Sequence, residues 1–323
     1  MNAHGPMDSY GSHIDYGNEN VVFQYNYSYN NEGGFAEVLG DNINCGYRYN
    51  ISVNDGYRED PYGTPWNKKG KIFWVSNFCG QNPIRCPSVG TFIYNNTIFV
   101  NDTLNPEIYF WPNVGDVHIY NNLIAVGQNG DIIPTLLEND LNDFYISHNL
   151  FYDSSRIDLD SNLENNALYG DPLLLNSVYL GENNPQAYQI QNNSLAIGSG
   201  FLINGSSDTT NYLEHNGGLD YFGNSVSHHF PSNIGAYNGT SPMDILQIKA
   251  KDIKLYPSVT DDNVNISIQQ YSGPLQTEIY DISGDFMGIQ SGKKLSLKHL
   301  NSGIYFCVVK YEDKYKNLRV VKL

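Results

Sequence analysis

The sequence predicts an all-β protein with two units. A right-handed parallel β-helix is expected over residues 1–240 and a small antiparallel β-sandwich over residues 255–323, with a linker at 241–254. Recurring β-rich runs predict the first unit, and hairpin-like runs predict the second. Charge separates them, because residues 1–240 hold 7 Lys and Arg against 25 Asp and Glu, whereas residues 241–323 hold 11 against 9.

An asparagine follows each of five β-rich runs in the first unit. Their spacings are 24, 46, 26 and 27 residues, and we interpret the 46 as containing a long insertion between Tyr57 and Val89. A period in the low twenties is typical of a parallel β-helix with three short strands per coil. Asparagines at one corner would then stack into a hydrogen-bonded ladder. The five are Asn26, Asn50, Asn96, Asn122 and Asn149.

Three later segments support the same fold. They are YGDPLLLNS from Tyr169, YQIQNNSLAIGSG from Tyr188 and LDYFGNSVSHHFPSNIGAY from Leu219. They resemble the closing coils of pectate-lyase-like β-helix proteins. Because that fold carries lyases, hydrolases, epimerases and passive adhesins alike, the resemblance implies the fold and leaves the substrate open.

The second unit contains short β-rich runs at Ile266–Ile268, Thr277–Ile282 and Ile304–Val309, separated by Ser-Gly pairs as antiparallel hairpins require. Four sequence blocks occur in order within residues 255–323 and include these runs. They are LYPSVTDDNVNIS, TEIYDISGDFM, LSLKHLNSGIYFCVV and RVVKL. Together they resemble the type A C-terminal sorting domain of the type IX secretion system of Bacteroidetes. The resemblance implies recognition by the secretion machinery through residues 255–323, and a secreted or cell-surface destination across the outer membrane.

Composition excludes several function classes. Seven basic residues in the first unit are too few for a nucleic-acid-binding surface. No apolar run reaches the ~18 residues that a membrane helix needs. Cys79 and Cys86 are close enough in sequence to form a local disulfide in an oxidising compartment, while Cys45 and Cys307 are expected to be lone buried thiols. No Cys/His spacing indicates zinc.

The N-terminal segment MNAHGPMDSYGSHIDYG has neither the basic region nor the apolar region of a signal peptide. Cargo of a type IX system must first cross the inner membrane. We therefore expect this chain to be the C-terminal fragment of a longer protein, with the β-helix truncated at its N-terminal end.

Ionisable residues inside predicted strands are the candidate catalytic groups. If Ile14, Ala36 and Val38 are buried, strand alternation turns their neighbours outward. These outward residues are His13, Asp15, Phe35 and Glu37.

Asp15 and Glu37 lie 22 residues apart, close to one coil. Coils stack about 4.8 Å apart, which is near the ~5 Å carboxylate separation of retaining glycosidases. We predict Asp15, Glu37 and His13 as the catalytic residues. Two alternatives stay open: a solvated acidic face, and a calcium site built from Asp15, Glu37 and Asp41.

Aromatic and polar residues around the insertion are the candidate substrate-binding groups. Flat rings stack on sugars, and arginines bind carboxylates or sulfates. The predicted set is Arg48, Asp55, Arg58, Trp66, Trp74, Tyr109 and Trp111.

These observations favour a secreted glycoside hydrolase that acts on an extracellular polysaccharide. No cofactor is expected, with calcium as the alternative. A non-catalytic surface adhesin or glycan-binding solenoid is the competing interpretation, and a polysaccharide lyase is the third. The few basic residues disfavour a lyase, which usually needs Lys or Arg as its base.

Overall fold

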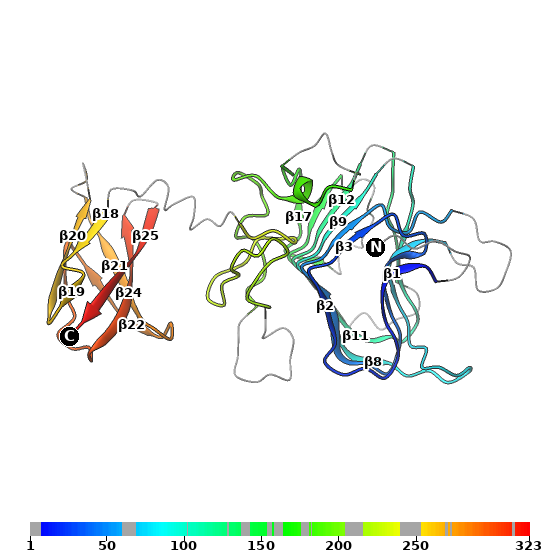
Figure 1. The fold of residues 1–323 in the computed structure, drawn as a ribbon, viewed down its shortest axis with the longest axis horizontal. Helices are drawn as coiled ribbons and strands as arrows, with labels where there is room; N and C mark the ends of the chain where they lie inside the picture. The colour runs from blue at the N-terminus through cyan, green and yellow to red at the C-terminus, as the bar shows by residue number, and fades with distance from the viewer. Residues whose placement is uncertain are drawn as a thin grey trace. The chain divides into compact units, whose positions relative to one another are not determined.

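The computed structural model describes residues 8–59, 69–101, 103–127, 129–136, 143–153, 157, 164–175, 181, 183–203, 216–239, 253–268, 271, 273–311 and 314–323 (Figure 1). The chain divides into two compact units, Met1–Gly239 and Thr240–Leu323. Most of the linker predicted at 241–254 lies outside the described residues, and the first strand of the second unit begins at Ile253.

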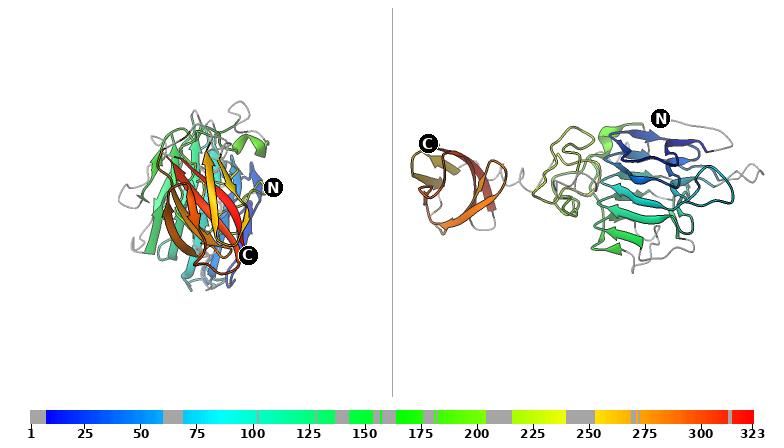
Figure 2. Two further views of the ribbon diagram at one scale, coloured as in Figure 1. Left: turned by 90° about the vertical axis from the view of Figure 1, so that its left-hand side faces the viewer. Right: turned by 90° about the horizontal axis from the view of Figure 1, so that it is seen from below.

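The first unit is a solenoid of three parallel sheets, to which successive coils contribute one strand each (Figures 1 and 2). Sheet A has the order β1 (Tyr10–Ile14), β4 (Gly34–Val38), β7 (Lys71–Val75), β10 (Glu107–Phe110) and β13 (Ile133–Leu136). Sheet B has the order β2 (Val22–Gln24), β5 (Ile43–Arg48), β8 (Ser88–Tyr94), β11 (Gly115–Tyr120), β14 (Phe144–Ser147) and β16 (Glu164–Asn165). Sheet C has the order β3 (Tyr27–Tyr29), β6 (Ile51–Val53), β9 (Thr97–Val100), β12 (Leu123–Val126), β15 (Leu150–Tyr152) and β17 (Leu168–Tyr169). The predicted parallel β-helix is confirmed.

The predicted asparagine ladder lies at the corner between sheets B and C. In each coil the backbone N–H and the side-chain Nδ2 of one asparagine donate to Oδ1 of the next, at 2.8–3.1 Å. The residue before each asparagine is left-handed, with φ between 50° and 61°, which turns the chain from one sheet into the next. The last asparagine, Asn149, donates to the carboxylate of Glu164 instead.

The 46-residue spacing from Asn50 to Asn96 is a single coil. These two side chains hydrogen-bond directly, so no further coil separates them. The extra residues lie on either side of β7, as the predicted insertion requires. The second of these segments contains the disulfide between Cys79 and Cys86, and Cys45 and Cys307 are free and buried as expected.

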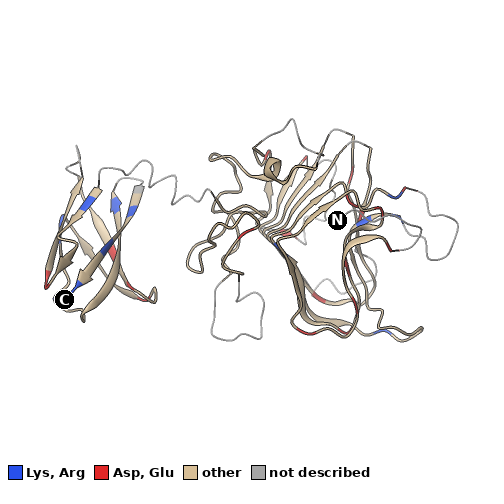
Figure 3. Ribbon diagram, in the orientation of Figure 1, with Lys and Arg blue, Asp and Glu red and all other residues tan. Residues whose placement is uncertain are grey.

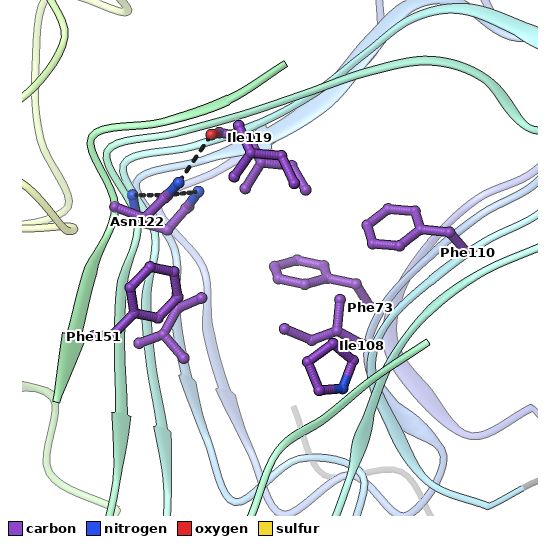
Figure 4. A pocket seen from close by; sticks show the side chains of 10 residues that line it. Phe73, Ile108, Phe110, Ile119, Asn122 and Phe151 are labelled. Atoms are coloured by element: carbon purple, nitrogen blue, oxygen red, sulfur yellow. Dashed lines mark hydrogen bonds between the residues drawn. The ribbon is translucent and has the colours of Figure 1, made fainter. Parts of the chain in front are cut away.

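The interior of the solenoid is apolar along its length. Its core includes Ile14, Ala36 and Val38 from sheet A, each about 1% exposed. Figure 4 shows the interior near the last coils, where Phe73 and Phe110 from sheet A lie across from the ladder residue Asn122. At the ladder, the asparagine side chains that enter this interior are hydrogen-bonded to neighbouring coils.

The segment after the last coil packs back along the outside of the ladder corner. The side chain of Asn95 donates to the carbonyls of Asn233 and Gly235, and Asn121 both accepts from and donates to the backbone of Phe201. A 3₁₀ turn, Pro185–Tyr188, belongs to this segment. Inner asparagines thus hold the coils together, and outer ones hold the closing segment.

The second unit is a two-sheet β structure that is antiparallel apart from one pair. One sheet contains β18 (Ile253–Tyr256), β20 (Asn263–Ile268) and β23 (Lys294–Ser296). The other has the order β19 (Val259–Thr260), β25 (Lys314–Lys322), β24 (Gly303–Tyr311), β21 (Gln276–Asp281) and β22 (Phe286–Ser291), with β19 and β25 parallel. Its core includes Val264, Ile279, Leu295 and Cys307. Figure 3 shows Lys and Arg along these strands and few on the solenoid.

Candidate functional site

A row of polar and aromatic side chains crosses sheet A. The parallel register aligns His13 of β1 with Glu37 of β4, Glu37 with Trp74 of β7, and Trp74 with Tyr109 of β10. Neighbouring strands of a sheet lie about 4.8 Å apart, so the four residues form one continuous strip. The strip belongs to the outer face, because Ile14, Val38 and Phe110 of the same strands fill the core.

An open cleft of about 440 Å³ lies over one end of this strip. His13, Glu37 and Trp74 line it, and Trp111 lies two residues beyond Tyr109 on the same side. The remaining lining residues are Asp8, Leu39, Ser76, Asn77, Phe78, Asn82 and Arg85. This size falls within the range of small-ligand sites, and aromatic rings beside polar groups suit a sugar.

Glu37 and His13 are the ionisable pair in the cleft. The Glu37 side chain is only 3% exposed, that of His13 is 39% exposed, and Nε2 of His13 lies 3.7 Å from Oε2 of Glu37. Burial lowers the pKa of His13 below its ordinary value, although the negative charges of Asp15 and Asp8 act to raise it. A neutral imidazole beside a nearly buried carboxyl group can take part in proton transfer.

The predicted stacking of Asp15 on Glu37 is wrong. The coil from β1 to β4 is 24 residues long, so Glu37 lies opposite His13 and not opposite Asp15. Asp15 follows the end of β1, is exposed, and accepts a hydrogen bond from the backbone N–H of Tyr16 at 2.9 Å. It does not line the cleft.

The predicted outward position of Phe35 is also wrong. Phe35 is 1% exposed and packs edge-on against Tyr47 and Phe73 in the core. Strict alternation fails here because the register between β7 and β10 shifts opposite Ile72, and Ile72 is buried like its neighbour Phe73. Phe35 of β4 lies level with Ile72 of β7 and, like Ile72, is buried.

A buried cation lies beside the aromatic part of the strip. Nζ of Lys71 is 3.1 Å from Oε2 of Glu107, 5.0 Å from the ring centre of Tyr109 and 5.8 Å from that of Trp74. Burial lowers the pKa of Lys71, while Glu107 acts to raise it. The positive charge lies within cation–π range of both rings and so holds them in place. Tyr109 packs against Trp111, with ring centres 6.2 Å apart.

Arg48 and Asp55, predicted as substrate-binding, have structural partners elsewhere. Arg48 donates to Gln24 and to the hydroxyl of Tyr94 in sheet B. Asp55 is 1% exposed and accepts from Asn31 and from the Ser52 hydroxyl, and burial raises its pKa to about 6 despite these hydrogen bonds. Neither residue lines the cleft.

Arg58 borders a second hollow, together with Tyr57, Glu59, Lys69 and residues of the segment before β10. Its side chain is 4% exposed and its Nε lies 3.4 Å from Oε1 of Glu32. This ion pair gives Arg58 a structural role, although it borders open space. Trp66 lies outside the described residues.

The loop closed by the Cys79–Cys86 disulfide forms one wall of the cleft. It contributes Asn82 and Arg85, which sequence reasoning missed, and Nη1 of Arg85 donates to Oδ1 of Asn82 at 2.9 Å. The two cysteines in the insertion were the available signal, because a disulfide fixes the loop between them. Asp8 was missed as well, since no strand pattern marks it.

Metal binding has no geometric support among the residues that the structure describes. There, no three His, Cys, Asp or Glu side chains gather closely enough to hold a metal ion, and this applies to the predicted calcium ligands Asp15, Glu37 and Asp41. No described helix is long and apolar enough to cross a membrane.

Comparison with known families identifies the second unit. Residues 254–322 match the family of the secretion system C-terminal sorting domain. No curated protein matches the chain. The predicted sorting domain is therefore confirmed, and the protein is secreted and directed to the cell surface by its second unit, which interacts with the secretion machinery.

Proposed function

We propose that the protein acts on an extracellular polysaccharide that binds in the cleft over sheet A, and that it is a glycoside hydrolase. The observation that carries the proposal is the register of His13, Glu37 and Trp74, which brings a nearly buried carboxyl group, an imidazole and an aromatic ring to one cleft. Export directed by the sorting domain supports a substrate outside the cell.

Glu37 acts as the general acid in this proposal. Glycoside cleavage needs a protonated carboxyl group at the leaving oxygen, and burial favours the protonated form. The second carboxylate is Asp8, which lines the same cleft as Glu37. Its separation from Glu37 would decide between retention and inversion of the sugar.

The aromatic residues position the sugar. Trp74 and Trp111 line the cleft, Tyr109 extends the strip between them, and Arg85 offers a cationic group at the wall. A pyranose ring stacked on Trp74 would place its glycosidic oxygen toward Glu37, the adjacent residue of the row. Arg48, Asp55 and Arg58 support the solenoid in this proposal and do not contact the sugar.

The test measures reducing ends released from a panel of polysaccharides, with ultraviolet absorbance of unsaturated products followed in parallel. We expect reducing ends without the unsaturated product, and a loss of at least about a hundredfold in the Glu37→Gln variant. Glu19→Gln, an exposed residue outside the cleft, is the matched control and should retain full activity. A parallel Asp8→Asn variant tests the second carboxylate.

A non-catalytic glycan-binding solenoid is the second candidate. It is favoured by the position of Asp15 outside the cleft, which leaves Glu37 without the stacked carboxylate that the sequence indicates. Glycan binding that persists in Glu37→Gln, with no product from any substrate, would replace hydrolysis by this function. Growth of the unsaturated product would instead indicate a lyase and direct attention to Arg85.

A further inference from the structure

One face of the sorting domain exposes an unusual amount of apolar surface. Ile282 is 69% exposed, Phe286 58%, Ile289 49% and Phe306 40%. Three of these lie on or beside the hairpin of β21 and β22, and Phe306 lies on the adjacent strand β24. We call this set, with the exposed Met287 of β22, the apolar face.

The pairing of the strands gathers the aromatic part of the apolar face around Tyr280. Tyr280 of β21 lies opposite Phe286 of β22 on one side and opposite Phe306 of β24 on the other, and the rings of Tyr280 and Phe286 are 5.6 Å apart. Ile289 lies opposite Glu278, two residues before Tyr280 on β21. Exposed apolar side chains gathered on one side of a sheet can mark an interaction site.

The apolar face is not needed for the core of the domain. The core is built by residues that alternate with it, namely Ile279 on β21 and Cys307 on β24, which are 1% and 0% exposed. Strand alternation sends Tyr280 and Phe306 to the opposite side of the sheet. Exposed aromatic residues on that side contribute little to folding, so their presence calls for a binding partner.

The two edge strands of this sheet differ in how much backbone they offer to another chain. The edge strand β19 is only two residues long, Val259–Thr260, and so offers little backbone to another chain. The opposite edge strand, β22, is six residues long and reads FMGIQS, without a charged residue or a proline. Natural edge strands are usually protected by charge, proline, shortness or a β-bulge. β22 lacks the first three and has one bulge, at Met287, where the register with β21 shifts.

We propose that the apolar face and the edge of β22 are the surface by which the secretion machinery binds this domain. The match to a secretion sorting domain fixes the occupant, because a component of that machinery must recognise this unit. The partner would present an aliphatic or aromatic strip, and an extended segment that pairs along β22. Arg319, which lies opposite Phe306, and the ion pair of Lys310 with Glu278 form a polar rim that sets its orientation.

The test uses the full chain, preceded by an export leader, in a bacterium that carries the secretion system. The exported fraction is measured by immunoblot of the periplasm, the cell surface and the medium. We expect Phe286→Ser combined with Phe306→Ser to lower the exported fraction about tenfold and to leave the protein in the periplasm. Leu195→Ser, which removes a 50% exposed apolar side chain from the solenoid, should export normally.

A second variant keeps the outcome independent of folding. Ile289→Lys places on β22 a charge of the kind that protects other edge strands. We expect this variant to block export and to leave the thermal unfolding temperature unchanged. Normal export of folded Ile289→Lys and of the double variant would overturn the proposal. Self-association of the purified chain through this face would also overturn the proposal, if sedimentation detects it and if it is lost in variants that are still exported.

Discussion

The corner between sheets B and C and the outer face of sheet A both carry polar side chains, but they use them differently. At the corner, Asn50 and Asn96 are fully buried, and each donates to and accepts from neighbouring coils. On sheet A, Glu37 and His13 lie beside a cleft that a ligand can enter. The difference teaches that a polar residue in a solenoid strand indicates function when its surroundings are open, and stability when the next coil completes its hydrogen bonds.

Removing one ladder asparagine should have the largest effect on stability. Asn96→Ala leaves the backbone N–H and Nδ2 of Asn50 without their acceptor in a buried corner. We expect the free energy of unfolding to fall by about 3 kcal/mol. Thermal or urea unfolding measures the change. Asn193→Ala, at an exposed position, should be as stable as the unchanged protein. An equal loss of stability in this variant would mean that a ladder asparagine contributes no more to stability than an exposed one.

The end of the ladder should make the solenoid sensitive to pH. Burial raises the pKa of Glu164 to about 7, although hydrogen bonds from Asn149 act to lower it. Because the folded state holds this proton more tightly than the unfolded chain, its stabilising contribution is complete below about pH 4.5 and is lost as pH rises to about 7.

We expect a decrease on the order of 2 kcal/mol in the free energy of unfolding across that window. Urea unfolding at several pH values measures it. Glu164→Gln should flatten the curve because an amide does not titrate, while its oxygen still accepts one of the two hydrogen bonds that Asn149 donates. A curve of unchanged slope would show that the Glu164 carboxyl group does not couple to folding.

On the outer face, Trp111→Ala should affect binding more than stability. We expect glycan affinity in the cleft to fall about tenfold, because the ring would stack on the sugar, and unfolding to change by about 1 kcal/mol. Isothermal calorimetry and thermal unfolding separate the two effects. Tyr169→Ala removes an exposed ring from sheet C and should leave affinity unchanged. Equal losses in both variants would mean that sheet A is no more a binding surface than sheet C.

Some of the site could be predicted from the sequence, and the reasons for the errors are specific. His13, Glu37, Trp74 and Trp111 were identified as candidates, and the structure brings them to one cleft. Asp15 was misplaced by a coil length assumed to be 22 residues where the structure has 24. A shift of two residues keeps the side chain on the same face of a strand, so alternation gave no warning.

The sequence by itself determined the two units, the coils, the asparagine ladder and the export signal. These follow from short patterns that repeat or that match a family, and each repeat requires the same local geometry. Only the tertiary structure decided which polar residues meet in the cleft. That outcome depends on the register between coils of unequal length, on the irregularity that turns Phe35 inward, and on a disulfide-closed loop that carries Arg85 to the wall of the cleft. Such contacts join residues far apart in the chain, and no local preference encodes them.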